Sequence, residues 1–436
     1  MTCMDDIDQN MDDVSTFTLA DVEGIGAVRL RKLNEAGIFR AEDLIIIGTN
    51  ELKDKINMDY GVCSDIIDKA RKSIDDNGII AKTKLSARDL LKHRKKTIQH
   101  LTTDSESLDR ILGGGIQTGS ITEVYGEFGC GKTQLAMVAS ITAQLPKNRT
   151  CLACGIEYII PNKPEEPYKP DENATDEEKS DYKESNKEYK ETLELYKDEL
   201  KEKSVDNCTC GGKIMGGGLS EYGKPCGVVY IDTENSFRPE RVLELIYEKE
   251  LVPLKEQTPM EKKREAPREP LNDVAEELAM QYLDRIDLRK PDSSGQQVLI
   301  GREMKGLLGD TTSEYPVRMI IVDSIMSAFR LDFGGRGDLS NRQIILKEHI
   351  KELSRIALVF NCIVLFTNQI MMNPNAMMGD PVKPVGGTVL SHTAKQIVYL
   401  RKGTKSKVVA KLVDSPDSAK DEAVLQLTKK GLEDGE

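Results

Sequence analysis

Residues 126–133 read Gly-Glu-Phe-Gly-Cys-Gly-Lys-Thr and fit the pattern G-x-x-x-x-G-K-[ST]. This stretch follows an apolar run (ITEVYG, 121–126) and precedes a helical one (QLAMVASITAQL, 134–145). Glycines at a strand-to-helix turn let backbone N–H groups face phosphate oxygens at the positive end of the helix. We therefore predict a phosphate-binding loop, the alternative being a glycine-rich turn that matches by chance.

This loop type assigns roles to its residues. Lys132 would reach the β- and γ-phosphates of a nucleoside triphosphate, and Thr133 would ligate Mg²⁺. Asp323 ends the apolar run RMIIVD and would hold Mg²⁺ through water, while Glu234, just past GVVYID, would orient the attacking water. For both acids the alternative is a solvated side chain at a strand end. The residues expected to bind the nucleotide here are Gly126, Glu127, Phe128, Gly129, Cys130, Gly131, Lys132, Thr133, Gln134 and Asp323.

Apolar runs alternate with helical patterns from about residue 98 onward. The strand-like runs are ITEVYG (121–126), GVVYID (227–232), RMIIVD (318–323), CIVLFTNQI (362–370) and QIVYLR (396–401). The middle ones are continuous rather than alternating, which indicates strands buried on both faces. This order predicts an α/β domain with a largely parallel central sheet.

The composition narrows the class of protein. The chain has 436 residues, 39% of them hydrophobic, which suits roughly two to three domains with packed cores. No apolar run approaches the roughly 18 residues of a membrane span, and the acidic N-terminus is unlike a secretory signal. We therefore expect a cytoplasmic protein without a membrane partner. The net charge of −12 argues against binding nucleic acid over the whole surface but leaves room for a local basic path.

Shifts in composition divide the chain into segments. The expected ones are a disordered acidic tail (1–16), a small all-α domain (17–75), a basic linker with one short helix (76–97) and the α/β core (98–436). An insertion at 146–226 interrupts the core and contains a charged helix over about 175–203. Residues 253–270 form a second, shorter interruption rich in proline and charge.

The longer insertion carries two short cysteine pairs, each followed by glycine: Cys151 with Cys154, and Cys208 with Cys210. Four thiolates at this spacing suit tetrahedral Zn²⁺, and the glycines let N–H groups turn toward sulfur. We therefore expect a structural zinc site. Cys226 is an alternative ligand, and four reduced, unlinked thiols are the other interpretation. No histidine or carboxylate joins the set, so a catalytic metal is not expected.

Seven segments in a fixed order are typical of one family. They are YGEFGCGKTQ, VYIDTENSFRPERV, MIIVDSIMSAFR, FGGRGDLSNRQ, TNQI, KPVGG and AKLVDSPDS. With them the chain resembles the archaeal RadA recombinases over residues 17–145 and 227–434, but not in the insertion between. The resemblance implies a RecA-like, DNA-dependent ATPase core behind a helix-hairpin-helix domain, with ATP and Mg²⁺ as ligands. It also implies a nucleoid-associated protein that assembles with itself on DNA as a filament or ring.

The resemblance implies roles for residues beyond the phosphate-binding loop. Gln369 would sense the γ-phosphate and act in hydrolysis with Lys132 and Glu234. Arg241 would stack on adenine. His392 would contact the γ-phosphate across a filament interface, the alternative being an ordinary surface imidazole. The residues that would cap the nucleotide of a neighbouring subunit are Asp414 and Pro416.

A protein that binds single-stranded DNA without sequence preference contacts the phosphate backbone, for which arginines and backbone N–H groups are suited. Residues 330–342 and 371–387 match the two DNA-binding loops of the family, with two ordinary mobile loops as the alternative. The basic residues expected to contact DNA are Arg330, Arg336, Arg342 and Lys383. In the N-terminal domain, Gly24 and Gly26 have the form of a helix-hairpin-helix turn that binds duplex DNA, and a purely structural helical pair is the alternative.

Three positions depart from the family pattern. The linker phenylalanine that joins family members into filaments falls on Lys84, with Leu85 or Ile80 as substitutes. Asn235 stands where the family has glycine and is expected to keep its left-handed backbone, and Ala419 stands at a proline position.

Together these patterns predict an ATP-dependent homologous recombinase that promotes pairing and strand exchange in DNA repair, with recombination mediators as further partners. The alternative is a regulatory paralogue that loads another recombinase without exchanging strands. A RecA-like helicase fits the ordered motifs less well.

Overall fold

The computed structural model describes residues 19–435 except for short stretches at 39–40, 77–85, 160–163, 165–166, 168, 170–174, 204, 310–312, 373–381 and 405–406. The acidic tail predicted at 1–16 and the linker positions Ile80, Lys84 and Leu85 lie outside the described residues. In the described part, no helix is long and apolar enough to cross a membrane.

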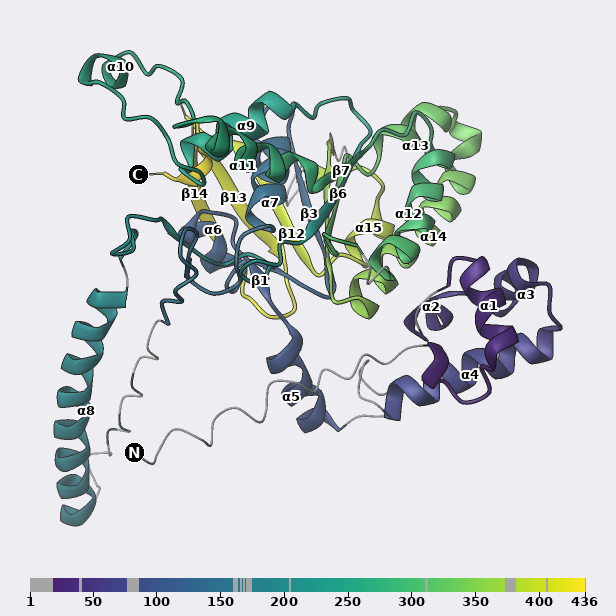
Figure 1. The fold of residues 1–436 in the computed structure, drawn as a ribbon, viewed down its shortest axis with the longest axis horizontal. Coiled ribbons are helices and arrows are strands. Elements are labelled where there is room, and N and C mark those ends of the chain that lie inside the picture. Colours follow the sequence, from purple (N-terminus) through teal and green to yellow (C-terminus); the bar gives the residue numbers. More distant parts are fainter. Residues whose placement is uncertain are drawn as a thin grey trace.

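Within the described residues, a nine-stranded sheet forms the centre of the larger domain, in the order β15-β14-β13-β12-β3-β9-β8-β6-β7 (Figure 1). The strands from β12 to β7 run parallel to their neighbours. Their bounds are β3 Ser120–Gly126, β6 Gly227–Asp232, β7 Ile286–Arg289, β8 Val317–Asp323, β9 Ile363–Asn368 and β12 Gln396–Lys402. The antiparallel strands that extend the sheet are β13 Lys407–Asp414, β14 Glu422–Thr428 and β15 Gly431–Asp434. The predicted α/β class with a largely parallel sheet is confirmed.

Helices cover both faces of this sheet (Figure 1). On one side lie α7 (Lys132–Thr142), α9 (Pro239–Glu248) and α11 (Asp273–Asp284), and on the other α12 (Ser294–Gly309), α13 (Ser327–Asp332) and α14 (Leu339–Val359). Successive residues of β6 enter opposite cores: Val228 and Tyr230 pack in one, Val229 and Ile231 in the other. This two-sided burial explains why the apolar runs are continuous. The smaller elements are β1 His100–Leu101, α6 Glu106–Ile111, β2 Ile116–Gln117 and α15 Thr388–Ser391.

The N-terminal domain is a separate helical unit with its own core. It contains η1 Leu19–Asp21, α1 Ala27–Glu35, α2 Ala41–Ile46, α3 Thr49–Ile56 and α4 Tyr60–Asp76. Leu33, Leu44, Leu52 and Ile66 are fully buried in it. The helix predicted in the linker is α5 (Ala87–Thr97), which exposes Leu90 and Leu91.

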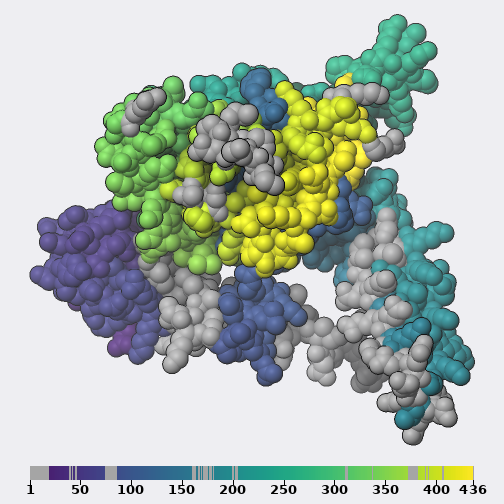
Figure 2. All heavy atoms as spheres, turned by 180° about the vertical axis from the view of Figure 1, so that it is seen from behind, coloured from purple at the N-terminus to yellow at the C-terminus, as the bar shows by residue number. Residues whose placement is uncertain are grey.

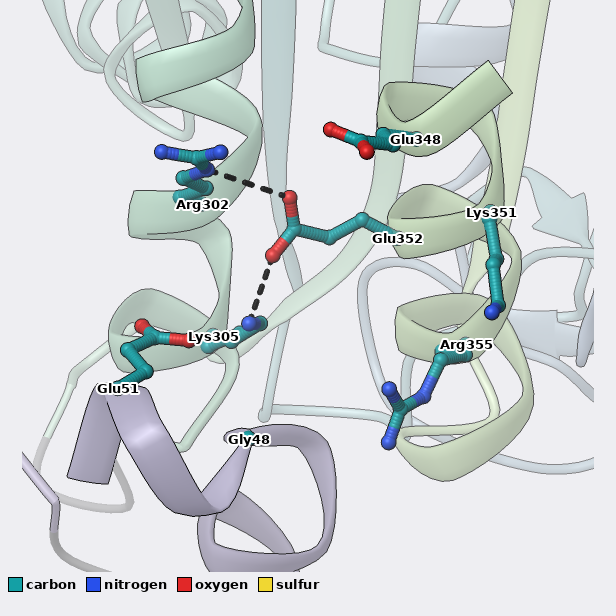
Figure 3. Close-up of a pocket in the computed structure, with 8 residues that line it drawn as sticks. All are labelled: Gly48, Glu51, Arg302, Lys305, Glu348, Lys351, Glu352 and Arg355. Carbon is teal, nitrogen blue, oxygen red and sulfur yellow. Dashed lines mark ion pairs between the residues drawn. The ribbon is translucent and has the colours of Figure 1, made fainter. Parts of the chain in front are cut away.

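Charged side chains line the space between this domain and the core (Figure 3). A cavity of about 470 Å³ separates the start of α3 from α12 and α14. At its wall, the Glu352 carboxylate is 2.6 Å from the Lys305 ammonium and 3.8 Å from the Arg302 guanidinium. A space lined by charged residues resembles a transient interface more than a shared core.

Both interruptions of the core form projecting elements (Figure 1). The longer one contains the charged helix α8 (Asp176–Lys203), as predicted, and a small pair of strands, β4 (Thr150–Cys151) with β5 (Ile214–Met215). The shorter one is a hairpin that carries α10 (Pro259–Lys263) and stands out beside the C-terminal strands (Figure 2).

Candidate nucleotide site, DNA loops and cysteine cluster

The predicted phosphate-binding loop joins β3 to α7. Gly129 and Gly131 have positive φ values of 73° and 94°, which only glycine adopts readily. A side chain at Gly126 would meet the Leu400 carbonyl oxygen at 2.2 Å, so close packing requires glycine there. The loop N–H groups thus lie at the N-terminus of a buried helix, as anion binding requires.

A cavity of about 500 Å³ opens over this loop. Most of the residues predicted to bind the nucleotide line this cavity, together with residues at or just after the ends of β6, β8 and β9. Its lining includes Gly126, Phe128, Gly129, Gly131, Lys132, Thr133, Gln134, Glu234, Asp323 and Gln369. Glu127 does not line it, and Cys130 is buried beneath the loop. The Lys132 ammonium donates hydrogen bonds to the carbonyls of Gly126 (2.9 Å) and Glu127 (2.8 Å), so its head lies at the loop.

Asp323 is almost fully buried at the end of β8. Its carboxylate accepts hydrogen bonds from Tyr230 (3.0 Å), Ser236 (3.2 Å) and Thr367. Burial raises the pKa of Asp323, and hydrogen bonds from Thr367, Thr133 and Tyr230 oppose that rise. The Thr133 hydroxyl therefore lies beside the Asp323 carboxylate, a pair of oxygen ligands that fits Mg²⁺.

Glu234 lies in a chain of hydrogen bonds that reaches the first predicted DNA loop. Its Oε1 accepts from the Ser324 hydroxyl at 2.5 Å and from Gln369 Nε2 at 3.0 Å. The Oε1 of Gln369 accepts in turn from Arg330 Nη1 at 2.5 Å. Asn235, next to Glu234, has φ of +52°, which confirms the left-handed backbone expected there.

Arg241 lies in a neighbouring cavity of about 730 Å³ that shares Gln134 and Leu427 with the first. Its guanidinium donates to Gln134 Oε1 (3.0 Å), to Glu244 Oε2 (2.6 Å) and to the Thr428 carbonyl (3.1 Å). These three bonds fix the guanidinium plane beside the phosphate-binding loop.

Three predicted nucleotide residues do not join the site of their own chain. His392 follows α15, and Asp414 and Pro416 lie at and just after the end of β13. All three side chains are exposed and line neither nucleotide cavity. Phe128, at the mouth of the site, is 95% exposed.

The predicted DNA residues lie on two segments that follow β8 and β9. Arg330 is on α13, and Arg342 is half-buried in the first turn of α14. Arg336 lies on a short 3₁₀ turn (η2, Arg336–Asp338), and its side chain is outside the description. Lys383 is exposed on β11 (Val382–Pro384), which pairs with β10 (Ile370–Met372) as the stem of the second loop.

In the N-terminal domain, Gly24 has φ of +86° and Gly26 immediately precedes α1. This tight turn leads directly into a helix, as the sequence predicted. Arg29 Nη1 donates to the Gly24 carbonyl at 2.7 Å.

The four cysteines of the insertion come together. All four sulfur atoms lie within 4.8 Å of one another, with Cys151–Cys210 at 3.5 Å and Cys154–Cys208 at 3.6 Å. Tetrahedral zinc with 2.3 Å bonds to sulfur would place sulfur atoms about 3.8 Å apart, so the cluster fits Zn²⁺. Cys226 does not belong to it, because this buried thiol donates to the Ala143 carbonyl at 3.1 Å. The alternative ligand considered from sequence is therefore wrong.

The surroundings of the cysteines also suit a metal. Backbone N–H groups of the knuckles hydrogen-bond to the sulfurs of Cys151, Cys154, Cys208 and Cys210. The glycines that follow the pairs, Gly155 and Gly211, have positive φ, as the turn requires. The backbone N–H of Cys210 lowers the pKa of the Cys208 thiol most, and a hydrogen bond from Tyr158, which the sequence did not single out, lowers it further.

Sequence reasoning missed the polar residues that hold the two site acids. Ser236 and Thr367 contact Asp323, and Ser324 contacts Glu234. Their positions in the sequence could have indicated them, because all three lie at or just past the carboxyl end of a parallel strand, where the sites of α/β proteins lie.

The sheet order, the loop between β3 and α7, and the acids at the ends of β6 and β8 define a class: a RecA-like α/β domain with a phosphate-binding loop. The Rad51 family model matches residues 93–168 and 295–435. A "DNA repair and recombination protein RadA" from Cenarchaeum symbiosum is 33% identical over 97% of this chain and 80% of its own length. Proteins of the same name from Methanoculleus marisnigri (33%; 96% and 99%) and Halobacterium salinarum (30%; 95% and 98%) are similar over almost their whole length. The chain belongs to the Rad51 family, with the archaeal RadA proteins as its relatives.

Proposed function

We propose that this protein is an ATP-dependent homologous recombinase of DNA repair. It assembles on single-stranded DNA and promotes pairing and strand exchange with a homologous duplex. Membership of the Rad51 family and relatives named for DNA repair and recombination support this function.

The observation that carries the proposal is the chain Arg330–Gln369–Glu234. In the proposed mechanism Arg330 binds a DNA phosphate, and this contact competes with its bond to Gln369. Gln369 is then free to reorient toward the γ-phosphate, and Glu234 orients the water that attacks it. DNA binding and ATP hydrolysis would thereby be coupled. Mg²⁺, held by Thr133 and through water by Asp323, would neutralise charge on the phosphates.

Two further sites complete the proposal. The four cysteines hold a Zn²⁺ that closes the base of the α8 arm. This zinc is structural, because four thiolates leave no open coordination position for catalysis. The turn at Gly24 and Gly26 binds duplex DNA through backbone N–H groups at the start of α1.

The decisive test is strand exchange between circular single-stranded DNA and a homologous linear duplex, using the full-length protein. We expect joint molecules that require both ATP and homology. Binding of ATP and DNA without any joint molecule would overturn the proposal and favour a regulatory paralogue.

A further inference from the structure

The hairpin over residues 253–270 is a built element that the proposed function does not use. Its arms are joined by hydrogen bonds from Lys255 N to the Glu269 carbonyl and from Leu271 N to the Pro253 carbonyl, both 3.0 Å. The helix α10 inside it begins with a capping box, in which Thr258 and Glu261 bond to each other's backbone N–H. These hydrogen bonds indicate that the hairpin has a defined conformation.

Two contacts hold the hairpin against the body of the core. At its base, Arg268 Nη1 lies 2.5 Å from the Glu250 carboxylate, just after α9. On its inner side, the Lys429 ammonium donates to the Glu265 carbonyl at 2.8 Å and lies 3.6 Å from the Glu265 carboxylate. Lys429 is in the turn between β14 and β15, so the second contact joins the hairpin to the edge of the sheet.

The Lys429–Glu265 pair lines the cavity that also contains Arg241. This cavity adjoins the one over the phosphate-binding loop, because Gln134 and Leu427 line both. A triphosphate bound at the loop would therefore direct its nucleoside toward the cavity. The chemistry fits a nucleoside: a guanidinium plane suits a base face, and amides, carboxylates and an ammonium suit ring nitrogens and ribose hydroxyls.

We propose that the hairpin 253–270 forms the outer wall of the nucleoside subsite, and that Lys429 and Glu265 contact the nucleoside end of bound ATP. The inference rests on the proposed function, since it takes the adjoining loop as the triphosphate site. The inference adds Lys429 and Glu265 to the residues proposed to bind ATP, and it assigns a function to the hairpin 253–270.

The experiment compares two ligands by calorimetry on the full-length protein: a non-hydrolysable ATP analogue and inorganic tripolyphosphate, each with Mg²⁺. Lys429→Ala should weaken the ATP analogue about threefold to tenfold, the value of one or two lost hydrogen bonds. Its affinity for tripolyphosphate should not change, because that ligand has no nucleoside. Glu265→Gln, which keeps the backbone contact with Lys429, should weaken the ATP analogue as well.

Lys255→Ala is the matched control. It removes an ion pair of the same kind, Lys255 with Glu269 at 2.8 Å, from the same hairpin but outside the cavity. The control should bind both ligands as the wild type does. If Lys429→Ala lowered the affinity for both ligands equally, or for neither, the hairpin would not form a wall of the nucleoside subsite. A wild type that binds neither ligand would instead refute the triphosphate site itself. A Lys429→Ala protein with normal affinity but altered self-association would make the cavity a contact between copies, which also contradicts the proposal.

Discussion

Glu234 is the residue on which hydrolysis should depend most. Ser324 and Gln369 hold its carboxylate at the wall of the nucleotide cavity. Glu234→Gln keeps the size of the side chain but removes the carboxylate that we propose orients the attacking water. We expect kcat to fall by about 10²- to 10⁴-fold with ATP affinity unchanged. Steady-state hydrolysis and calorimetry measure the two quantities, and Lys132→Ala is the contrast that should lose affinity. Wild-type turnover in Glu234→Gln would exclude Glu234 from the mechanism.

Glu123 predicts a pH dependence of stability. It is fully buried in β3, where Asn368 donates to one carboxylate oxygen at 2.8 Å and the other oxygen has no partner within the described residues. Burial raises its pKa from 4.5 to about 7. Since this pKa is higher in the folded than in the unfolded chain, the stability that Glu123 contributes is complete below about pH 4.5 and is lost as the pH rises through about 7.

A Glu123→Gln variant tests this titration because glutamine cannot ionise. Between pH 5.5 and 8, the unfolding free energy of the wild type should fall by about 2 kcal/mol relative to that of the variant. Urea denaturation at several pH values measures the difference. A difference that stays constant over this range would mean that Glu123 has an ordinary pKa in the folded protein.

At the residue scale, the sequence predicted what belongs to a local pattern. The loop residues from Gly126 to Thr133 are adjacent in the chain, so their spacing alone defines the motif. The groups around Asp323 come from β6, the turn after it and the end of β9. Only the order of strands in the sheet brings them together, and no sequence spacing encodes that order.

At the scale of elements, the cysteine cluster predicts a zinc-dependent module. The full-length protein should contain about one Zn²⁺ per chain, because four thiolates complete a tetrahedral site. Removing the metal should expose residues 146–226 to protease, since ligand binding stabilises the folded module. Metal analysis and limited proteolysis measure these effects.

Two cysteine variants separate the ligands from the fifth thiol of the insertion, Cys226. Cys208→Ser should lose the zinc and gain the cleavage, whereas Cys226→Ala should keep the metal because Cys226 lies outside the cluster. ATP affinity should stay near that of the wild type in Cys208→Ser. Full zinc retention in Cys208→Ser would refute the four-cysteine site.

The elements that the sequence left unassigned are those without a buried run. The central strands are continuous apolar runs and were recognised, whereas β13 and β14 alternate exposed and buried residues at the sheet edge. The short β7 is only partly buried. The hairpin at 253–270 was visible only as an interruption, because its shape depends on hydrogen bonds between its arms rather than on an apolar pattern.

At the scale of the whole molecule, charged side chains line the space between the N-terminal domain and the core. There Arg302 and Lys305 on α12 pair with Glu352 of α14, on the core side of the cavity that Gly48 and Glu51 also line (Figure 3). Charged residues on a helix surface are ordinary in any sequence, so no pattern distinguishes these from solvated ones. The linker contact expected at Leu85 or Ile80 stays a prediction, because both positions lie outside the described residues.

Self-assembly yields the last prediction. His392, Asp414 and Pro416 are exposed and line no nucleotide cavity of their own chain, so a neighbouring copy is expected to receive them. We therefore expect His392→Ala and Lys132→Ala each to hydrolyse ATP poorly on single-stranded DNA. In a head-to-tail assembly, each site combines the phosphate-binding loop of one copy with His392 of its neighbour. When the two variants are mixed one to one, about a quarter of the sites combine the intact loop of a His392→Ala chain with the intact histidine of a Lys132→Ala chain. The mixture should thus recover up to about that share of wild-type activity. A mixture no more active than its components would contradict a site shared between copies, because a histidine that acts within its own chain cannot restore activity to either variant.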